Sequence, residues 1–96
     1  MEFEWNENKN KEDIKKHGIS FEEATEVFHD PLHISIMDRR FDYFDERWIT
    51  IGSTKTGNFI VLGHLYYLTE NGEEVIKIIT ARKATRKEKK QYETIG

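Results

Sequence analysis

The sequence has no cysteine and no long apolar run, and each absence excludes a class of protein. Without cysteine the chain has no disulfides, no thiolate chemistry and no access to most structural zinc sites. No apolar run reaches the roughly 18 residues that a membrane span needs, and the N-terminus lacks the apolar core of a signal peptide. We therefore expect a cytoplasmic protein that makes no contact with a membrane.

Length and charge limit what remains. A chain of 96 residues is long enough for one domain with one core, so we expect a single domain over residues 1–96. The net charge of −3 argues against a protein that coats nucleic acid indiscriminately. The charges are segregated, with acids gathered in residues 2–30 and 38–46 and bases dominant in residues 82–90. The sequence thus predicts a basic region and an acidic region on one domain.

Periodicity predicts an α+β fold: an antiparallel sheet with two N-terminal helices on one face, and a C-terminal helix. The first helix, over residues 7–16, is polar and expected on the surface, whereas the second begins at the capping box of Ser20 and Glu23 and ends at Asp30-Pro31. Segment 38–45 is charged and aromatic, which indicates a loop that serves as a contact surface. Strands are expected over residues 1–5, 33–37, 46–53, 59–68 (the central one) and from 74 onward.

Two glycine turns set the predicted strand register. Asn71-Gly72 is typical of a two-residue type I′ hairpin turn, and Thr56-Gly57 is read in the same way. A one-residue slip at the second of these would exchange the sheet faces of Glu46 and Arg47. The predicted register puts a shallow trough on one face, for which a second packed face is the alternative. Its members are Thr50, Gly63 and Thr80 along the middle, Trp48 and Tyr67 as walls, and Arg82 at one end.

The stretch from Glu74 to Tyr92 has the most distinctive chemistry. An apolar strand leads into a helix that we expect to begin within two residues of Thr85, which forms a capping box with Glu88. A strand that ends in a basic helix holds cations on a rigid support, as phosphate binding requires. A solvated helix whose lysines only maintain solubility is the alternative. The cations are Arg82, Lys83, Arg86, Lys87, Lys89 and Lys90.

Three segments, in order and at the family's spacing, resemble BrnT-type toxins. They are FEW with KHGISFEEA and VFxDP in residues 3–31, ERWITIG in residues 46–52, and IITARKATRxExxxY in residues 78–92. The resemblance implies a RelE-like fold and a ribonuclease toxin of a bacterial type II toxin–antitoxin system that inhibits translation. It also implies an RNA substrate and a small cognate DNA-binding antitoxin, with DNA reached only through the antitoxin complex. Asp13 departs from the family, in which asparagine is common.

The reaction implied by this resemblance requires no metal and no cofactor, because the 2′-hydroxyl of the RNA attacks the adjacent phosphate. Arg82 and Arg47 are candidate catalytic residues, since a guanidinium binds phosphate through two donors. Glu46 or His64 is the candidate base. No spacing of histidines and carboxylates indicates a metal site. The candidate RNA-binding residues are Lys16, His17, Lys83, Arg86, Lys89 and Lys90.

Structural alternatives exist for several of these residues. His64 lies in an apolar run, as a core histidine would, and Lys16 and His17 suit the C-terminal end of a helix. Glu46 and Arg47 also fit a cross-strand ion pair. A non-catalytic RNA- or protein-binding module of the same fold is the alternative function.

Overall fold

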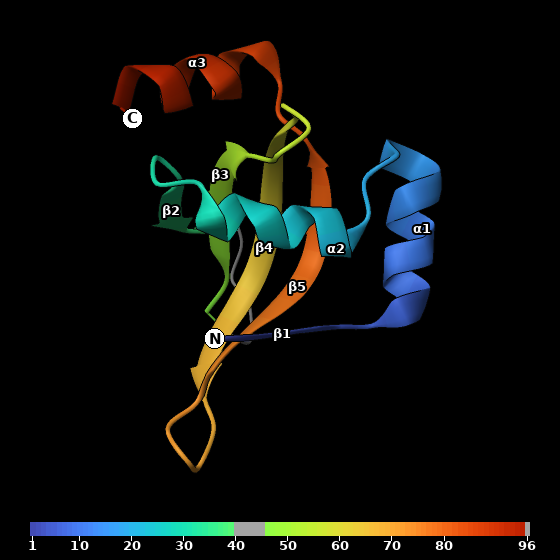
Figure 1. The fold of residues 1–96 in the computed structure, drawn as a ribbon, viewed down its shortest axis with the longest axis vertical. Helices are drawn as coiled ribbons and strands as arrows, with labels where there is room; N and C mark the ends of the chain where they lie inside the picture. Colours follow the sequence, from blue (N-terminus) through green and yellow to red (C-terminus); the bar gives the residue numbers. More distant parts are fainter. Residues whose placement is uncertain (40–45, 96) are drawn as a thin grey trace.

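The computed structural model describes residues 1–39 and 46–95, which form a five-stranded sheet with helices on one face and across one end (Figure 1). The strand order is β1-β5-β4-β3-β2, so the apolar run predicted as the central strand does lie in the middle. The α+β fold class is confirmed, with the refinement that β1 runs parallel to β5 while the other neighbouring strands are antiparallel. The strands are β1 (Glu2–Trp5), β2 (Ile34–Met37), β3 (Trp48–Ser53), β4 (Phe59–Leu68) and β5 (Glu74–Lys83).

The helices begin and end where their capping residues predict. Asn6 accepts hydrogen bonds from the first backbone amides of α1, and Gly18 ends that helix with a φ of 70°. The second predicted helix is a short α-helix that tightens into a 3₁₀ helix before Asp30. The last helix begins one residue after Thr85, within the predicted range. The elements are α1 (Glu7–His17), α2 (Phe21–Ala24), η1 (Thr25–His29) and α3 (Arg86–Ile95).

The core lies between α2 and η1 on one side and the sheet on the other. Gly52 permits this close packing, because a Cβ there would come within 2.8 Å of a methyl carbon of Val27. Trp5 and Phe28 pack at the edge of the core, Trp5 against Phe21 with their ring centroids 6.2 Å apart. The core cluster consists of Ile19, Phe21, Ala24, Val27, Ile60, Leu62, Ile76, Ile78 and Ala81.

Helix α1 is attached to the core by polar side chains, which its composition did not reveal. Asn10 and Asp13 are its buried residues, whereas Ile14, its only large apolar residue, is exposed. The Asn10 side chain accepts a hydrogen bond from the Phe21 amide at 2.8 Å, and Asp13 accepts one from the Ala81 amide at 2.9 Å. The predicted surface position is therefore correct, but the helix is fixed there by buried hydrogen bonds.

Both hairpin turns contain three residues, so the predicted two-residue turns are wrong. At the first turn the Thr54 amide donates to the Asn58 carbonyl at 2.9 Å, and Gly57 has a φ of 84°. At the second turn the Thr69 amide donates to the Glu73 carbonyl at 2.9 Å, and Gly72 has a φ of 80°. A type I′ turn would need positive φ at Asn71 also, and in the described part of the chain only glycines have it.

The longer turns change which residues share a face. In β3–β4 the register moves by one, so that Ile49 rather than Thr50 faces Gly63. In β4–β5 a bulge next to Gly63 restores the predicted Gly63–Thr80 pair. The face under the helices therefore carries Thr50 and His64, which are hydrogen-bonded, while the isoleucines of β3 lie on the open face.

In residues 1–39 and 46–95, no helix is long and apolar enough to cross a membrane. The predicted contact loop over residues 38–45 lies mostly outside the described residues, since only 38 and 39 belong to them.

Candidate functional site

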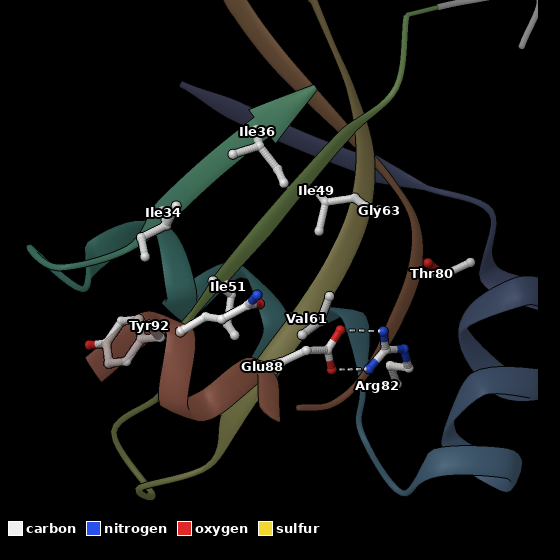
Figure 2. A pocket seen from close by; sticks show the side chains of 11 residues that line it. Ile34, Ile36, Ile49, Ile51, Val61, Gly63, Thr80, Arg82, Glu88 and Tyr92 are labelled. Carbon is white, nitrogen blue, oxygen red and sulfur yellow. Dashed lines mark hydrogen bonds and ion pairs between the residues drawn. The ribbon is translucent and has the colours of Figure 1, made fainter. Parts of the chain in front are cut away.

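Two rows of side chains cross the open face of the sheet and form the floor of a pocket of about 400 Å³ (Figure 2). Gly63 hollows out the middle of the floor, where a Cβ would approach the Thr80 hydroxyl to 3.0 Å. The trough predicted around Gly63, Thr80 and Arg82 is present, but the shifted register puts Ile49 in place of Thr50 in its middle row. Neither Trp48 nor Tyr67, the predicted walls, lines it. One row consists of Ile34, Ile51, Val61 and Arg82, and the other of Ile36, Ile49, Gly63 and Thr80. Glu88, Gln91 and Tyr92 of α3 close one side of the pocket.

The two ends of the pocket differ in chemistry. The end formed by β2 and β3, which we call the apolar end, consists of Ile34, Ile36, Ile49 and Ile51. The opposite end, which we call the polar end, carries Thr80, Arg82 and Glu88 where β5 leads into α3 (Figure 2). One pocket thus joins an apolar surface to a charged group.

An ion pair between Arg82 and Glu88 dominates the polar end. Two nitrogens of the guanidinium donate to the two carboxylate oxygens at 2.7 and 2.8 Å, the forked geometry that arginine and carboxylate favour. Glu88 also accepts a hydrogen bond from the Thr85 amide at 2.9 Å, and its own amide donates to the Thr85 hydroxyl, so the predicted capping box is present. The bonds from Arg82 and, to a lesser degree, from Thr85 lower the pKa of Glu88 to about 2.

A second set of contacts fixes α3 against the sheet. The Tyr92 hydroxyl donates to Asp30 at 2.6 Å, and the same carboxylate oxygen accepts the Ser53 amide at 2.9 Å. Burial raises the pKa of Asp30, but the hydrogen bonds from Tyr92 and Ser53 outweigh it and leave that pKa below its ordinary value. The Tyr92 ring packs edge-on against Phe59, with their ring centroids 5.3 Å apart. The helix that carries Glu88 is therefore held in place at a second point.

Comparison with known proteins assigns the chain to a family. The family model for the ribonuclease toxin BrnT of type II toxin–antitoxin systems matches residues 5–88. The chain belongs to the BrnT family. The crystal structure of the Brucella abortus ribonuclease toxin BrnT matches this fold with a TM-score of 0.61 and 23% sequence identity, over 90% of this chain and 99% of that one. No curated protein matches the chain.

Membership of the BrnT family confirms the predicted resemblance. The chain is a ribonuclease toxin of a type II toxin–antitoxin system, which implies an RNA substrate and an antitoxin partner.

The predicted RNA-binding residues of this BrnT chain lie at one end of the molecule. Lys16 and His17 are exposed in the last turn of α1, which points toward the end of the sheet that carries α3 (Figure 1). Lys83, Arg86, Lys89 and Lys90 are exposed on β5 and α3, and Lys89 also lies over the Phe59 ring, 4.5 Å from its centroid. The cations that the sequence groups in the last segment thus lie on the strand end and the helix that adjoin Arg82 in the chain.

The other predicted catalytic residues, His64, Glu46 and Arg47, are not brought to Arg82. His64 is buried on the opposite face, its Nε2 is 2.7 Å from the Thr50 hydroxyl, and burial lowers its pKa. Its surroundings are those of a core histidine, the alternative left open above. Arg47 and exposed Glu46 precede β3, and Arg47 lies four residues from Ile51, the β3 member of the row that contains Arg82. At ~3.3 Å per residue this offset is about 13 Å.

Glu88 is the site residue that sequence reasoning assigned only to helix capping. Its sequence signal is its isolation, as the single acid among six cations in residues 82–90. Such an acid within reach of a strand-end arginine is a candidate partner for it. The distance between them, however, depends on the angle at which α3 leaves β5.

Proposed function

We propose that this chain, as a single BrnT-type toxin domain over residues 1–96, is a cytoplasmic endoribonuclease that inhibits translation by cleaving RNA without a metal. The 2′-hydroxyl oxygen of the RNA bonds to the adjacent phosphorus and forms a phosphorane, in which five oxygens surround the phosphorus. The bond from phosphorus to the 5′ oxygen of the next nucleotide then breaks, which leaves a 2′,3′-cyclic phosphate and a 5′-hydroxyl. Water takes the proton of the 2′-hydroxyl and supplies one to the leaving oxygen, while the toxin stabilises the negative charge of the phosphorane. The observation that carries this proposal is the position of Arg82, at the rim of a pocket and among exposed cations.

Arg82 is the residue that meets the scissile phosphate. Glu88 holds the guanidinium by two bonds, so its direction is set before RNA arrives. Preorganised donors of this kind supply a large share of catalysis, with one correctly aimed donor worth roughly 3–4 kcal/mol. The phosphorane places additional negative charge next to Arg82, which strengthens their attraction in the transition state relative to the ground state.

The exposed cations of α3 and β5 bind the rest of the RNA backbone. Lys83, Arg86 and Lys90 are exposed beside the polar end and attract phosphates irrespective of base sequence. Glu88, with a pKa of about 2, is ionised at neutral pH and is a weak base. Charge stabilisation by Arg82 therefore contributes more to the proposed reaction than proton abstraction by a positioned base.

The proposal includes the partner. A small cognate antitoxin that binds DNA keeps the toxin inactive, and the toxin reaches DNA only within that complex. Support comes from the family, whose members belong to type II toxin–antitoxin systems. The RelE-like description of the fold belongs to the same proposal.

A cleavage assay tests the proposed reaction. Purified toxin is incubated with a generic RNA in EDTA, and the products are examined for 2′,3′-cyclic phosphate ends. We expect such ends from the wild type, and a loss of about 10²–10³ in turnover at saturating RNA for Arg82→Ala. Arg82→Lys keeps the charge without the fork and should recover part of the rate.

Lys90→Ala is the matched control, since it removes an exposed cation from the same basic region. It should weaken RNA binding and reduce its salt dependence, while turnover at saturation stays near the wild-type value. Equal losses in the Arg82→Ala and Lys90→Ala proteins would show that the basic end is only an electrostatic surface. RNA binding by the wild type without any cleavage would favour the binding module instead.

A further inference from the structure

We propose that the apolar end of the pocket is the docking site of the antitoxin, for a segment that carries apolar side chains followed by carboxylates. This inference deepens the proposed function, on whose toxin–antitoxin pairing it rests. It assigns a partner to a surface that the proposed RNA cleavage does not use.

The apolar end exposes a surface that a folded chain ordinarily covers. Ile34 faces Ile51 and Ile36 faces Ile49 across β2 and β3, so four isoleucines share one side of two strands. Ile36 is 57% exposed, although it belongs to this row. A contiguous apolar surface rimmed by polar residues marks an interaction site more often than a solvated face.

The rim of the pocket determines the charge of the occupant. Lys87 and Lys90 line a second hollow along α3, which shares Gln91 with the pocket. A segment that leaves the isoleucines toward α3 therefore passes ammonium groups and is stabilised there by carboxylates. RNA phosphates can pair with these ammonium groups, but RNA has no apolar side chains to cover the isoleucines. A protein segment with both apolar and acidic residues can cover the isoleucines and pair with the ammonium groups.

A second copy of this chain is the other occupant with suitable chemistry. The β4–β5 hairpin carries exposed Tyr66, Tyr67 and Leu68 at the end of β4, and Glu70 and Glu73 at its turn. Insertion of that hairpin into the pocket of another copy would be a head-to-tail contact between two different surfaces. Such contacts form rings or open filaments rather than a closed pair. Toxins of this family belong to toxin–antitoxin systems, and binding of an antitoxin to the pocket requires no ring or filament.

Occupancy of the apolar end also explains neutralisation. Ile34 and Arg82 end the same four-strand row, so three inter-strand steps of ~4.8 Å separate them, about 14 Å in all. An extended segment of roughly four or five residues covers that distance. Docked on the isoleucines, it reaches the polar end and excludes RNA from Arg82.

Substitution of Ile36 tests the proposal. The probe is the purified antitoxin encoded beside the toxin gene, titrated against full-length toxin by calorimetry. We expect Ile36→Asp to raise Kd at least 100-fold and Ile36→Ala to raise it about 10-fold, as at central interface residues. Both variants should cleave RNA at the wild-type rate, because Ile36 lies at the opposite end of the pocket from Arg82.

Leu68→Asp is the matched control, since Leu68 is 60% exposed and lies on the hairpin away from the pocket. Its Kd for the antitoxin should stay within twofold of the wild type. If Ile36→Asp fails to fold, by circular dichroism and thermal unfolding, Ile36→Ala and amide chemical-shift mapping of β2 and β3 decide the question. Shifts confined to other elements would overturn the proposal.

The outcomes separate this inference from the proposed function. Wild-type affinity for the antitoxin in Ile36→Asp overturns the inference, whatever the RNA assay shows. Loss of self-association in both Ile36→Asp and Leu68→Asp, with antitoxin binding unchanged, would assign the pocket to a second copy. A toxin that cleaves no RNA, but whose antitoxin binding is lost with Ile36→Asp, would refute the proposed chemistry and support the docking site.

Discussion

The pair of Arg82 and Glu88 leads to the sharpest prediction, which concerns Glu88→Gln. The substitution removes one negative charge and keeps the length of the side chain. Glutamine serves in a capping box as glutamate does, so the bond to the Thr85 amide is retained and α3 still begins at Arg86. The perturbation is therefore confined to the two charge-assisted bonds from Arg82, at 2.7 and 2.8 Å.

The effect on stability follows from the pKa of Glu88. A decrease from the ordinary value of 4.5 to about 2 corresponds to about 3 kcal/mol at most, for all hydrogen bonds to the carboxylate together. The Arg82 side chain is 38% exposed, so solvent screening reduces its share to about 1 kcal/mol. Because the folded pKa lies below the unfolded value, this contribution is complete above pH 4.5 and is lost as the pH falls toward 2. Glu88→Gln should abolish that part of the pH dependence.

Glu88→Gln should change both kcat and KM. Without its two bonds to Glu88 the Arg82 guanidinium is held only by weaker contacts, such as its bond to the Lys83 carbonyl at 3.3 Å. A displacement of about 1 Å costs up to 10²-fold in rate, so we expect kcat to fall about 10-fold. A carboxylate at ~5 Å from a phosphate repels it by about 1 kcal/mol in water, so KM should fall about fivefold when the charge is removed.

Steady-state RNA cleavage and urea unfolding at pH 7 and pH 3 measure these effects. Glu93→Gln is the control, because Glu93 is exposed on the same helix and the substitution removes the same charge. It should leave kcat at the wild-type value. A Glu88→Gln protein with wild-type kcat would refute the idea that Glu88 aims Arg82.

Three further substitutions test the structure around the site. Asp13→Ala leaves the buried Ala81 amide without its acceptor and should lower the free energy of unfolding by about 1–3 kcal/mol in urea titrations, whereas Asp13→Asn keeps an acceptor and should cost less. Tyr92→Phe removes a donor from Asp30 and should destabilise by about 1 kcal/mol at pH 7. The difference from wild type should shrink as the pH falls below the ordinary Asp30 value of 3.8, which unfolding at pH 7 and pH 2.5 would check. Gly52→Ala places a Cβ 2.8 Å from a core methyl carbon and should lower the thermal midpoint, at a cost of about 1–3 kcal/mol.

Most of the elements could be predicted because their signals are local. Asn6 and Gly18 bound α1 through contacts within a few residues, and the Thr85–Glu88 capping box marks the start of α3. The apolar run over residues 59–68 indicates a strand at its observed bounds. Each of these signals depends on residues that are close together in the chain. The sequence therefore contains the information that is needed to predict the bounds of these elements.

The register could not be predicted because two turn geometries fit the same residues. A two-residue and a three-residue hairpin turn both require glycine, and they differ in whether the preceding residue also takes positive φ. Side chains alternate between faces with a period of two, so this one-residue difference moved Ile49 to the open face and Thr50 to the core side. The sign of φ at Thr56, the residue before Gly57, thus determines which side chains of β3 line the pocket.

The composition of the candidate site has a similar origin. The sequence alone establishes that an arginine lies near the end of the last strand, that a basic helix follows it, and that the chain resembles the BrnT family to which it belongs. Two contacts of the site depend on how helices and strands pack together. Asp13 accepts a hydrogen bond from the Ala81 amide, 68 residues away, and Glu88 forms an ion pair with Arg82. Hydrogen bonds and ion pairs act over a few ångströms, so only the folded chain, which brings distant residues within that range, decides which of them meet.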